Sequence, residues 1–210
     1  MLDAVATQRD NIARAIELAE QAFRAGGRLF YVGAGTSGRL GVLDASECPP
    51  TFGTDPEMVQ GIIAGGFAAL TRSQEGAEDV VRDGADAMTA HQVGPRDFVL
   101  GIAASGTTPY VRGALERAVE LGAHTGILAC SPPDDSVLRL VDVAIIPITG
   151  AEPVTGSTRM KAGTATKLVL NAISTGAMIR IGKTYGNLMV DLRAMSAKLV
   201  DRGERIVMEV

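Results

Sequence analysis

The stretch Leu29-Phe-Tyr-Val-Gly-Ala-Gly-Thr-Ser-Gly38 joins a short apolar run to a glycine-rich turn. Apolar runs of this length that end at glycine are typical of buried strands in parallel sheets. The next residues, Arg39 to Ser46, return to helical spacing, and we expect Pro49-Pro50 to end that helix. A strand, a glycine-rich turn and a helix in this order predict the first unit of an α/β fold.

The same alternation continues along the chain. Apolar runs predict five strands, at 29–32, 59–64, 98–103, 124–129 and 141–148. Helical patterns lie between these strands at 67–90, with a break near Gly76, and at 110–121. Another helical pattern follows the last strand at 162–181. We therefore expect a three-layer αβα fold, with helices on both faces of a five-stranded, mainly parallel sheet.

No repeat, linker or low-complexity tract divides the chain. We expect a single domain over residues 1–210. It would consist of an N-terminal helix at 2–25, an α/β core at 28–182 and a C-terminal helix at 187–208.

The composition is that of an ordinary globular protein. Of the 210 residues, 46% are hydrophobic and 21% are charged, and the formal net charge is −4. This acidic balance argues against a nucleic-acid or anionic-membrane partner. No run of about 18 apolar residues predicts a membrane span, and no secretory signal is visible. Cys48 and Cys130 lack metal-ligand spacing, so we expect free thiols, no metal site and a cytoplasmic location.

Gly33-Ala-Gly-Thr-Ser-Gly38 matches the G-x-G-x-x-G pattern of dinucleotide-binding proteins. In those proteins an acidic residue at the end of the second strand holds a ribose hydroxyl. Here the second predicted strand ends in Ala64-Gly-Gly-Phe67, which offers no carboxylate. Gly38 is also not followed by the Lys and Ser/Thr of a Walker loop. The pattern argues against a nucleotide, and we expect no cofactor.

Two turns that follow predicted strands are rich in hydroxyl groups. Thr36 and Ser37 precede Gly38 in the first turn, and Ser105-Gly106-Thr107 forms the second. Hydroxyls beside the free N–H groups of a helix N-terminus suit a phosphate monoester, and Ser and Thr also serve as ordinary helix caps. Because the loops after parallel strands share one edge of the sheet, the two turns together favour a phosphorylated sugar.

A third polar loop precedes the last large helix. Residues 150–163 read GAEPVTGSTRMKAG and add hydroxyls, two cations and Glu152. The loop carries more polar chemistry than a connection needs, which favours a place for Glu152 in substrate binding. The ordinary alternative, which the sequence supports equally, is that Arg159 and Lys161 are solvated and that Thr158 caps the helix.

A sugar phosphate without a metal or a nucleotide limits the chemistry to proton removal beside a carbonyl, as in isomerisation, epimerisation or elimination. His91 and His124 stand in a turn and at a strand start, where surface or packing roles are usual. Glu47 precedes the stiff Cys48-Pro-Pro50 segment, and Glu78 stands at an expected helix start. Spacing alone leaves Glu47 balanced between catalysis and a surface role, and favours an ordinary role for Glu78.

Six segments carry a wider resemblance: GAGTSGRLGVLDASECPP at 33–50, GIIAGG at 61–66, EGAED at 75–79, GIAASG at 101–106, VTGSTRMKAGTATK at 154–167 and GNLMVD at 186–191. Together they resemble the N-acetylmuramic acid 6-phosphate etherases of the sugar isomerase (SIS) superfamily. The resemblance implies a cytoplasmic homodimer of SIS domains that needs no cofactor. It would cleave the lactyl ether of N-acetylmuramic acid 6-phosphate into D-lactate and N-acetylglucosamine 6-phosphate, in cell-wall amino-sugar recycling.

The resemblance also assigns roles to residues. The family's two catalytic glutamates fall on Glu47 and Glu78. It implies that Glu78 removes the proton on C2, that protonated Glu47 donates to the departing ether oxygen, and that the hydroxyls of the first two turns hold the phosphate. The core also resembles the SIS modules of glucokinase regulatory proteins, so a phosphosugar-binding regulatory module is the alternative. An aldose–ketose isomerase is a third possibility.

Overall fold

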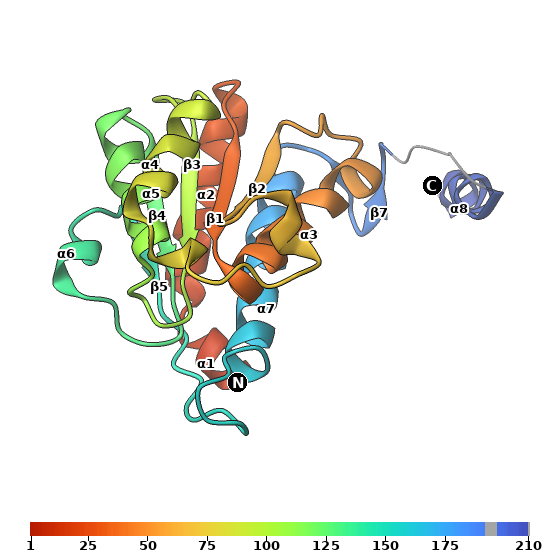
Figure 1. Cartoon of the computed structure of the whole chain (residues 1–210). Helices are drawn as coiled ribbons and strands as arrows, with labels where there is room; N and C mark the ends of the chain where they lie inside the picture. The colour runs from red at the N-terminus through yellow and green to blue at the C-terminus, as the bar shows by residue number, and fades with distance from the viewer. Residues whose placement is uncertain (192–196, 210) are drawn as a thin grey trace.

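The computed structural model describes residues 1–191 and 197–209. Its main sheet has the strand order β2-β1-β3-β4-β5, and all neighbouring strands are parallel (Figure 1). The strands are β1 (Leu29–Gly33), β2 (Val59–Ile63), β3 (Phe98–Ile102), β4 (His124–Leu128) and β5 (Val143–Ile145). The expected α/β fold class is confirmed, although β5 is much shorter than the predicted 141–148, because it pairs only with residues 126–128 of β4.

Helices cover both faces of the sheet (Figure 1). One layer contains α2 (Arg9–Arg24), α3 (Gly35–Phe52) and α7 (Lys161–Arg180), and the other contains α4 (Val81–Ala90) and α5 (Pro109–Glu120). Side chains of each strand alternate between the two cores, as the period of two in a strand requires. Tyr31 packs among α2, α3 and α7, whereas its neighbour Phe30 packs among α4 and α5.

The chain changes direction across the sheet at β1. After β1 it adds β2 on one side, and it then crosses to add β3 on the other side. In open parallel sheets ligands bind beyond the carboxyl ends of the strands at such a switch point. The loops after β1 and β3 both begin there, and both are the hydroxyl-rich turns found in the sequence.

Shorter elements complete the fold: α1 (Leu2–Ala6), 3₁₀ turns at Phe67–Leu70 and Ala77–Asp79, α6 (Asp135–Leu138), β6 (Thr184–Tyr185), β7 (Leu188–Met189) and α8 (Ala197–Glu209). Within the described ranges, no helix combines the length and the apolar composition needed to cross a membrane.

The expected end of α3 at Pro49-Pro50 is wrong, because the helix continues to Phe52. Proline has a helical φ but lacks an N–H group, so the loss falls on the carbonyls one turn earlier. These prolines stand in the last turn, so the carbonyls of Ala45 and Ser46 lose their partners and the helix continues for only two residues beyond Pro50. Gly53, in the left-handed conformation with φ of 63°, then ends the helix by donating its N–H to the Pro49 carbonyl.

Three other helix predictions need correction. The stretch 67–90 is helical only at its two 3₁₀ turns and in α4, and Gly76 has a φ of 74° just before the second turn. The N-terminal helix is divided into α1 and α2, and the Gln8 side chain between them accepts the N–H of Ile146 at 3.0 Å. The C-terminal helix does not start at 187, because β6 and β7 form an antiparallel pair around Gly186. Its residues 192–196 lie outside the described ranges.

Glycines bring α3 unusually close to the sheet. A Cβ atom on Gly61 of β2 would lie 2.4 Å from the Cα of Val42, and one on Gly38 would lie 2.7 Å from the carbonyl oxygen of Gly33. A Cβ on Gly41 would lie 2.8 Å from the Cβ of Tyr31. Atoms do not approach this closely without a shift, so any side chain at these positions would push α3 away from β1 and β2.

We therefore expect Gly61→Ala to lower the free energy of unfolding by about 1–3 kcal/mol, the usual cost of overpacking a core. The control is Gly94→Ala, because a Cβ there would meet no atom within 4 Å. Urea unfolding of the two variants and the parent chain measures the effect. Equal stability of the two variants would contradict the close packing of α3 on β2.

Candidate functional site

The first turn of α3 lies at the carboxyl end of β1. No side chain caps it, and Gly35 has a φ of 51° at the helix start. The first backbone N–H groups of a helix have no partner within the helix, so this turn presents free donors. Thr36 and Ser37 are half-buried beside them, and Gly38 is buried against Gly33.

The loop after β3 forms a compact hydroxyl turn. The N–H and the hydroxyl of Thr107 both donate to the Ser105 oxygen, at 3.3 and 3.2 Å. Gly106 between them has a φ of 78°, a conformation that favours glycine. Ser105 and Thr107 are exposed, and α5 begins directly afterwards at Pro109.

The third loop reaches the same edge of the sheet. Ala104, just before the hydroxyl turn, packs against a small cluster that consists of Cys130 and of Ala162 and Ala165 from the start of α7. Gly163 of that turn faces the methyl group of Thr36, which would lie 3.7 Å from an added Cβ. The starts of α3 and α7 and the loop after β3 are therefore neighbours.

Glu152 serves the start of α7. Its two carboxylate oxygens accept the N–H groups of Lys161 and Ala162, at 3.0 and 2.9 Å. These two backbone hydrogen bonds lower the pKa of Glu152. In the structure Glu152, rather than the expected Thr158, accepts the N–H groups at the start of α7, and its contact with substrate stays a prediction.

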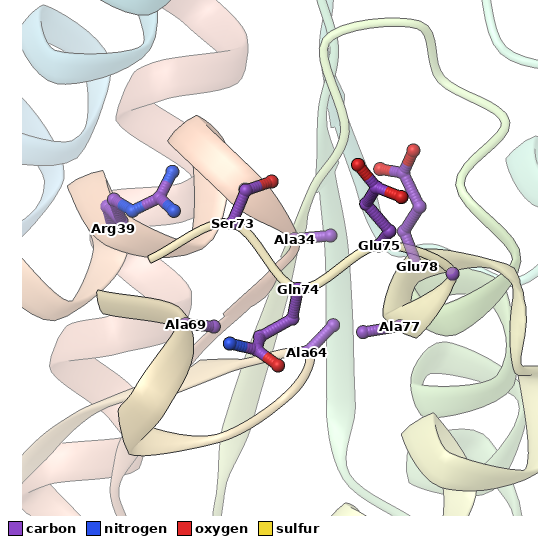
Figure 2. Close-up of a pocket in the computed structure, with 11 residues that line it drawn as sticks. Ala34, Arg39, Ala64, Ala69, Ser73, Gln74, Glu75, Ala77 and Glu78 are labelled. Atoms are coloured by element: carbon purple, nitrogen blue, oxygen red, sulfur yellow. The ribbon is translucent and has the colours of Figure 1, made fainter. Parts of the chain in front are cut away.

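A pocket of about 240 Å³ lies beside the first turn of α3, on the side of β2 (Figure 2). Its lining comes from α3, the end of β2 and the irregular segment before α4: Ala34, Gly35, Arg39, Ala64, Ala69, Ser73, Gln74, Glu75, Gly76, Ala77 and Glu78. Arg39 and Ser73 project from one side of the view, and Glu75 and Glu78 from the other (Figure 2). Ala64, which follows β2, offers only a methyl group at the position where a dinucleotide site needs a carboxylate.

Glu47 is not part of this pocket. It is exposed on α3 and lines a separate pocket of about 150 Å³, together with Asp44, Cys48 and residues of α7. Within one chain, the two glutamates that the resemblance pairs therefore line different pockets.

The surroundings of Glu47 are polar but partly buried. Asp44 is only 5% exposed, and one of its oxygens accepts hydrogen bonds from Asn171 and Ser174 of α7. Burial raises the pKa of Asp44 against the effect of these bonds. Burial also raises the pKa of Cys48 to about 12, and the Asp44 and Glu47 carboxylates add to the shift. The thiol stays protonated, so Cys48 is not a nucleophile at neutral pH.

Sequence reasoning predicted Glu78 as a site residue but missed four other polar residues that line the same pocket. These are Arg39, Ser73, Gln74 and Glu75. Arg39 follows Gly35 by one helical turn, so helical spacing could have placed both residues on one face of α3. The segment that contains Ser73 was expected to be helical, and for that reason it was not considered as part of a binding site. None of the predicted phosphate residues Thr36, Ser37, Ser105 and Thr107 lines the pocket, although Thr36 directly follows Gly35 of its lining.

Solved structures share the fold. A phosphoheptose isomerase from Francisella tularensis superposes with a TM-score of 0.62 at 14% identity, covering 85% of this chain and 90% of that one. The NanR protein of Vibrio vulnificus, solved with ManNAc-6P, superposes with a TM-score of 0.53 at 17% identity, covering 100% of this chain and 66% of that one.

Sequence comparison identifies the family. Residues 11–119 match the model of the glucokinase regulatory protein N-terminal SIS domain. The N-acetylmuramic acid 6-phosphate etherase of Synechococcus elongatus is 63% identical over 209 residues, which cover 100% of this chain and 68% of that protein. With this identity along its whole length, and with the match to an SIS domain model, the chain belongs to the N-acetylmuramic acid 6-phosphate etherase family.

Proposed function

We propose that this chain is a carbon–oxygen lyase. It cleaves the D-lactyl ether of N-acetylmuramic acid 6-phosphate, giving D-lactate and N-acetylglucosamine 6-phosphate. The observation that carries the proposal is the 63% identity to an etherase across the chain, combined with Glu78 in a pocket at the ligand-binding edge of the sheet. The reaction belongs to peptidoglycan and amino-sugar recycling, and we expect it in the cytoplasm.

The phosphate is assigned to the hydroxyl-rich edge. The uncapped first turn of α3 supplies free N–H groups and the positive end of the helix dipole. Thr36, Ser37 and the Ser105–Thr107 turn supply hydroxyls from both sides of the β1–β3 switch point. A phosphorylated amino sugar anchored there would extend its remaining carbons over Ala34 toward the pocket that contains Glu78.

The chemistry follows from the opened sugar. Its C1 aldehyde acidifies the proton on C2, and the Glu78 carboxylate accepts that proton. The electron pair of the C2–H bond forms a C2–C3 double bond while the C3–oxygen bond breaks, and the lactate oxygen leaves with a proton from Glu47. Water then adds at C3 and a proton returns to C2. An ether needs this route because an unassisted alkoxide leaves poorly, and each positioned acid or base contributes about 10²–10⁴ in rate.

Glu47 requires a second copy of the chain in this scheme. Leu43, Glu47 and Pro50 follow one another at helical spacing on the outer face of α3, and all three are exposed, Leu43 by 49%. We propose that this face pairs with another subunit in a homodimer. The Glu47 of one subunit would thereby reach the Glu78 pocket of the other.

The two alternatives are weaker. A regulatory module that only binds phosphosugars has no need for the two glutamates at the positions of the etherase motif, and this chain has both. An isomerase would interconvert aldose and ketose phosphates and leave the ether intact. The relatives at high identity carry the etherase name rather than either of these.

The direct test is release of D-lactate from N-acetylmuramic acid 6-phosphate, measured with the full chain. We expect Glu78→Gln to lower the rate at least about 100-fold, because the amide cannot accept the C2 proton. Solvent deuterium should appear at C2 of the product of the parent chain. The matched control is Glu57→Gln, an exposed glutamate outside the pocket, whose rate should equal that of the parent. Tight binding of the substrate without lactate release would instead identify a regulatory module.

A mixing experiment tests the shared site. Glu47→Gln and Glu78→Gln should each be inactive alone. After the two variants are unfolded and refolded together, half of the dimers are mixed, and each mixed dimer has one intact site. We expect about a quarter of the parent activity for random pairing in a two-fold dimer. If the mixture stays as inactive as its components, the two glutamates do not come from different subunits.

A further inference from the structure

Among the described residues, the Arg39 guanidinium has no ion-pair partner. It extends from the second turn of α3 into the pocket that contains Glu78 (Figure 2). Its Nε donates a hydrogen bond to the Leu70 carbonyl at 3.1 Å. Across residues 1–191 and 197–209, neither terminal nitrogen of its guanidinium has a hydrogen-bond or ion-pair partner. The Leu70 contact fixes one edge of the guanidinium and leaves the other edge for a ligand.

The two acidic side chains of the pocket lie away from the Arg39 guanidinium. Glu75 and Glu78 line the same pocket, but Figure 2 shows them on the side away from Arg39, and neither forms an ion pair with it in the described part of the chain. A half-buried guanidinium has lost part of its water shell, so an anionic ligand group is its natural partner. The pocket thus offers a proton acceptor on one side and an anion site on the other.

The substrate of the proposed reaction carries two anions. One is the phosphate on C6, and the other is the carboxylate of the lactyl group on C3. The proposed function assigns the phosphate to the hydroxyls at 36–37 and 105–107, and these side chains do not line this pocket. The pocket with Glu78 takes C2 and C3, and the lactyl group is attached there. The second anion is therefore the one that reaches Arg39.

We infer that Arg39 binds the lactyl carboxylate and makes the site specific for muramic acid phosphates over glucosamine phosphates; this rests on the proposed function. The two terminal N–H groups of a guanidinium match the two oxygens of a carboxylate. Held at this end, the lactyl group cannot rotate freely, and its ether oxygen is kept beside C3 while the proton leaves C2.

Equilibrium binding to two ligands tests the inference. The measurements use the Glu78→Gln chain, in which turnover should be at least about 100-fold slower. They compare N-acetylmuramic acid 6-phosphate with N-acetylglucosamine 6-phosphate. The second ligand has the phosphate but no lactyl group. Adding Arg39→Gln should weaken binding of the first ligand about 10–100-fold, the usual loss for a hydrogen-bonded charge pair, and leave the second unchanged. The control is Arg72→Gln, an exposed arginine that does not line the pocket, and it should change neither.

Each other outcome has a defined meaning. An equal loss for both ligands would place Arg39 on the phosphate, and no loss for either would remove it from the site; both results overturn the inference. Arg39→Lys, which keeps the stem and the charge, is the second variant if the glutamine variant does not fold, and it should weaken binding of the lactyl ligand alone. If the parent chain releases no D-lactate, the proposed function fails, while the difference between the two ligands still reports on Arg39.

Discussion

The close contact between α3 and the sheet is the constraint on which the site depends. Gly33 and Gly38 lie against each other, and Gly61 lies against the backbone of Val42. Because nothing larger than hydrogen separates these backbones, the first turn of α3 is held at the carboxyl end of β1. That position aims its free N–H groups at the β1–β3 switch point and brings Arg39 one turn later beside the end of β2.

Sequence patterns predicted the strands and most helices of the fold better than the residues that line the pocket. Buried strands and the helix after Gly38 follow from local rules, since apolar runs and helical spacing depend on near neighbours. The pocket wall at Ser73–Glu78 has no such period, and the helix-forming composition around it suggested a regular helix. Pro49-Pro50 misled by a few residues, because proline's fixed φ is helical and the helix therefore ends at Phe52, after the prolines rather than before them. Motif resemblance paired Glu47 with Glu78, but the spacing of a motif does not state whether its residues meet within one chain.

In the proposed binding mode, different polar groups bind different parts of the substrate. Hydroxyls and helix amides suit a phosphate, which accepts hydrogen bonds on several oxygens. A guanidinium suits a planar carboxylate, and an exposed carboxylate stays available as a base. Around Glu47 the environment differs, because Asp44 is buried and bonded to α7. That bonding links α3 to α7 one helical turn before Glu47.

The cap that Glu152 forms on α7 also has a consequence for selectivity. A helix N-terminus attracts any nearby anion, and α7 begins next to the first turn of α3. Glu152 occupies the α7 amides with an internal anion, and its lowered pKa keeps that anion charged as the surroundings turn acidic. In the proposed binding mode, the substrate phosphate therefore has the uncapped first turn of α3 as its helix N-terminus, because the N-terminus of α7 is already occupied by Glu152.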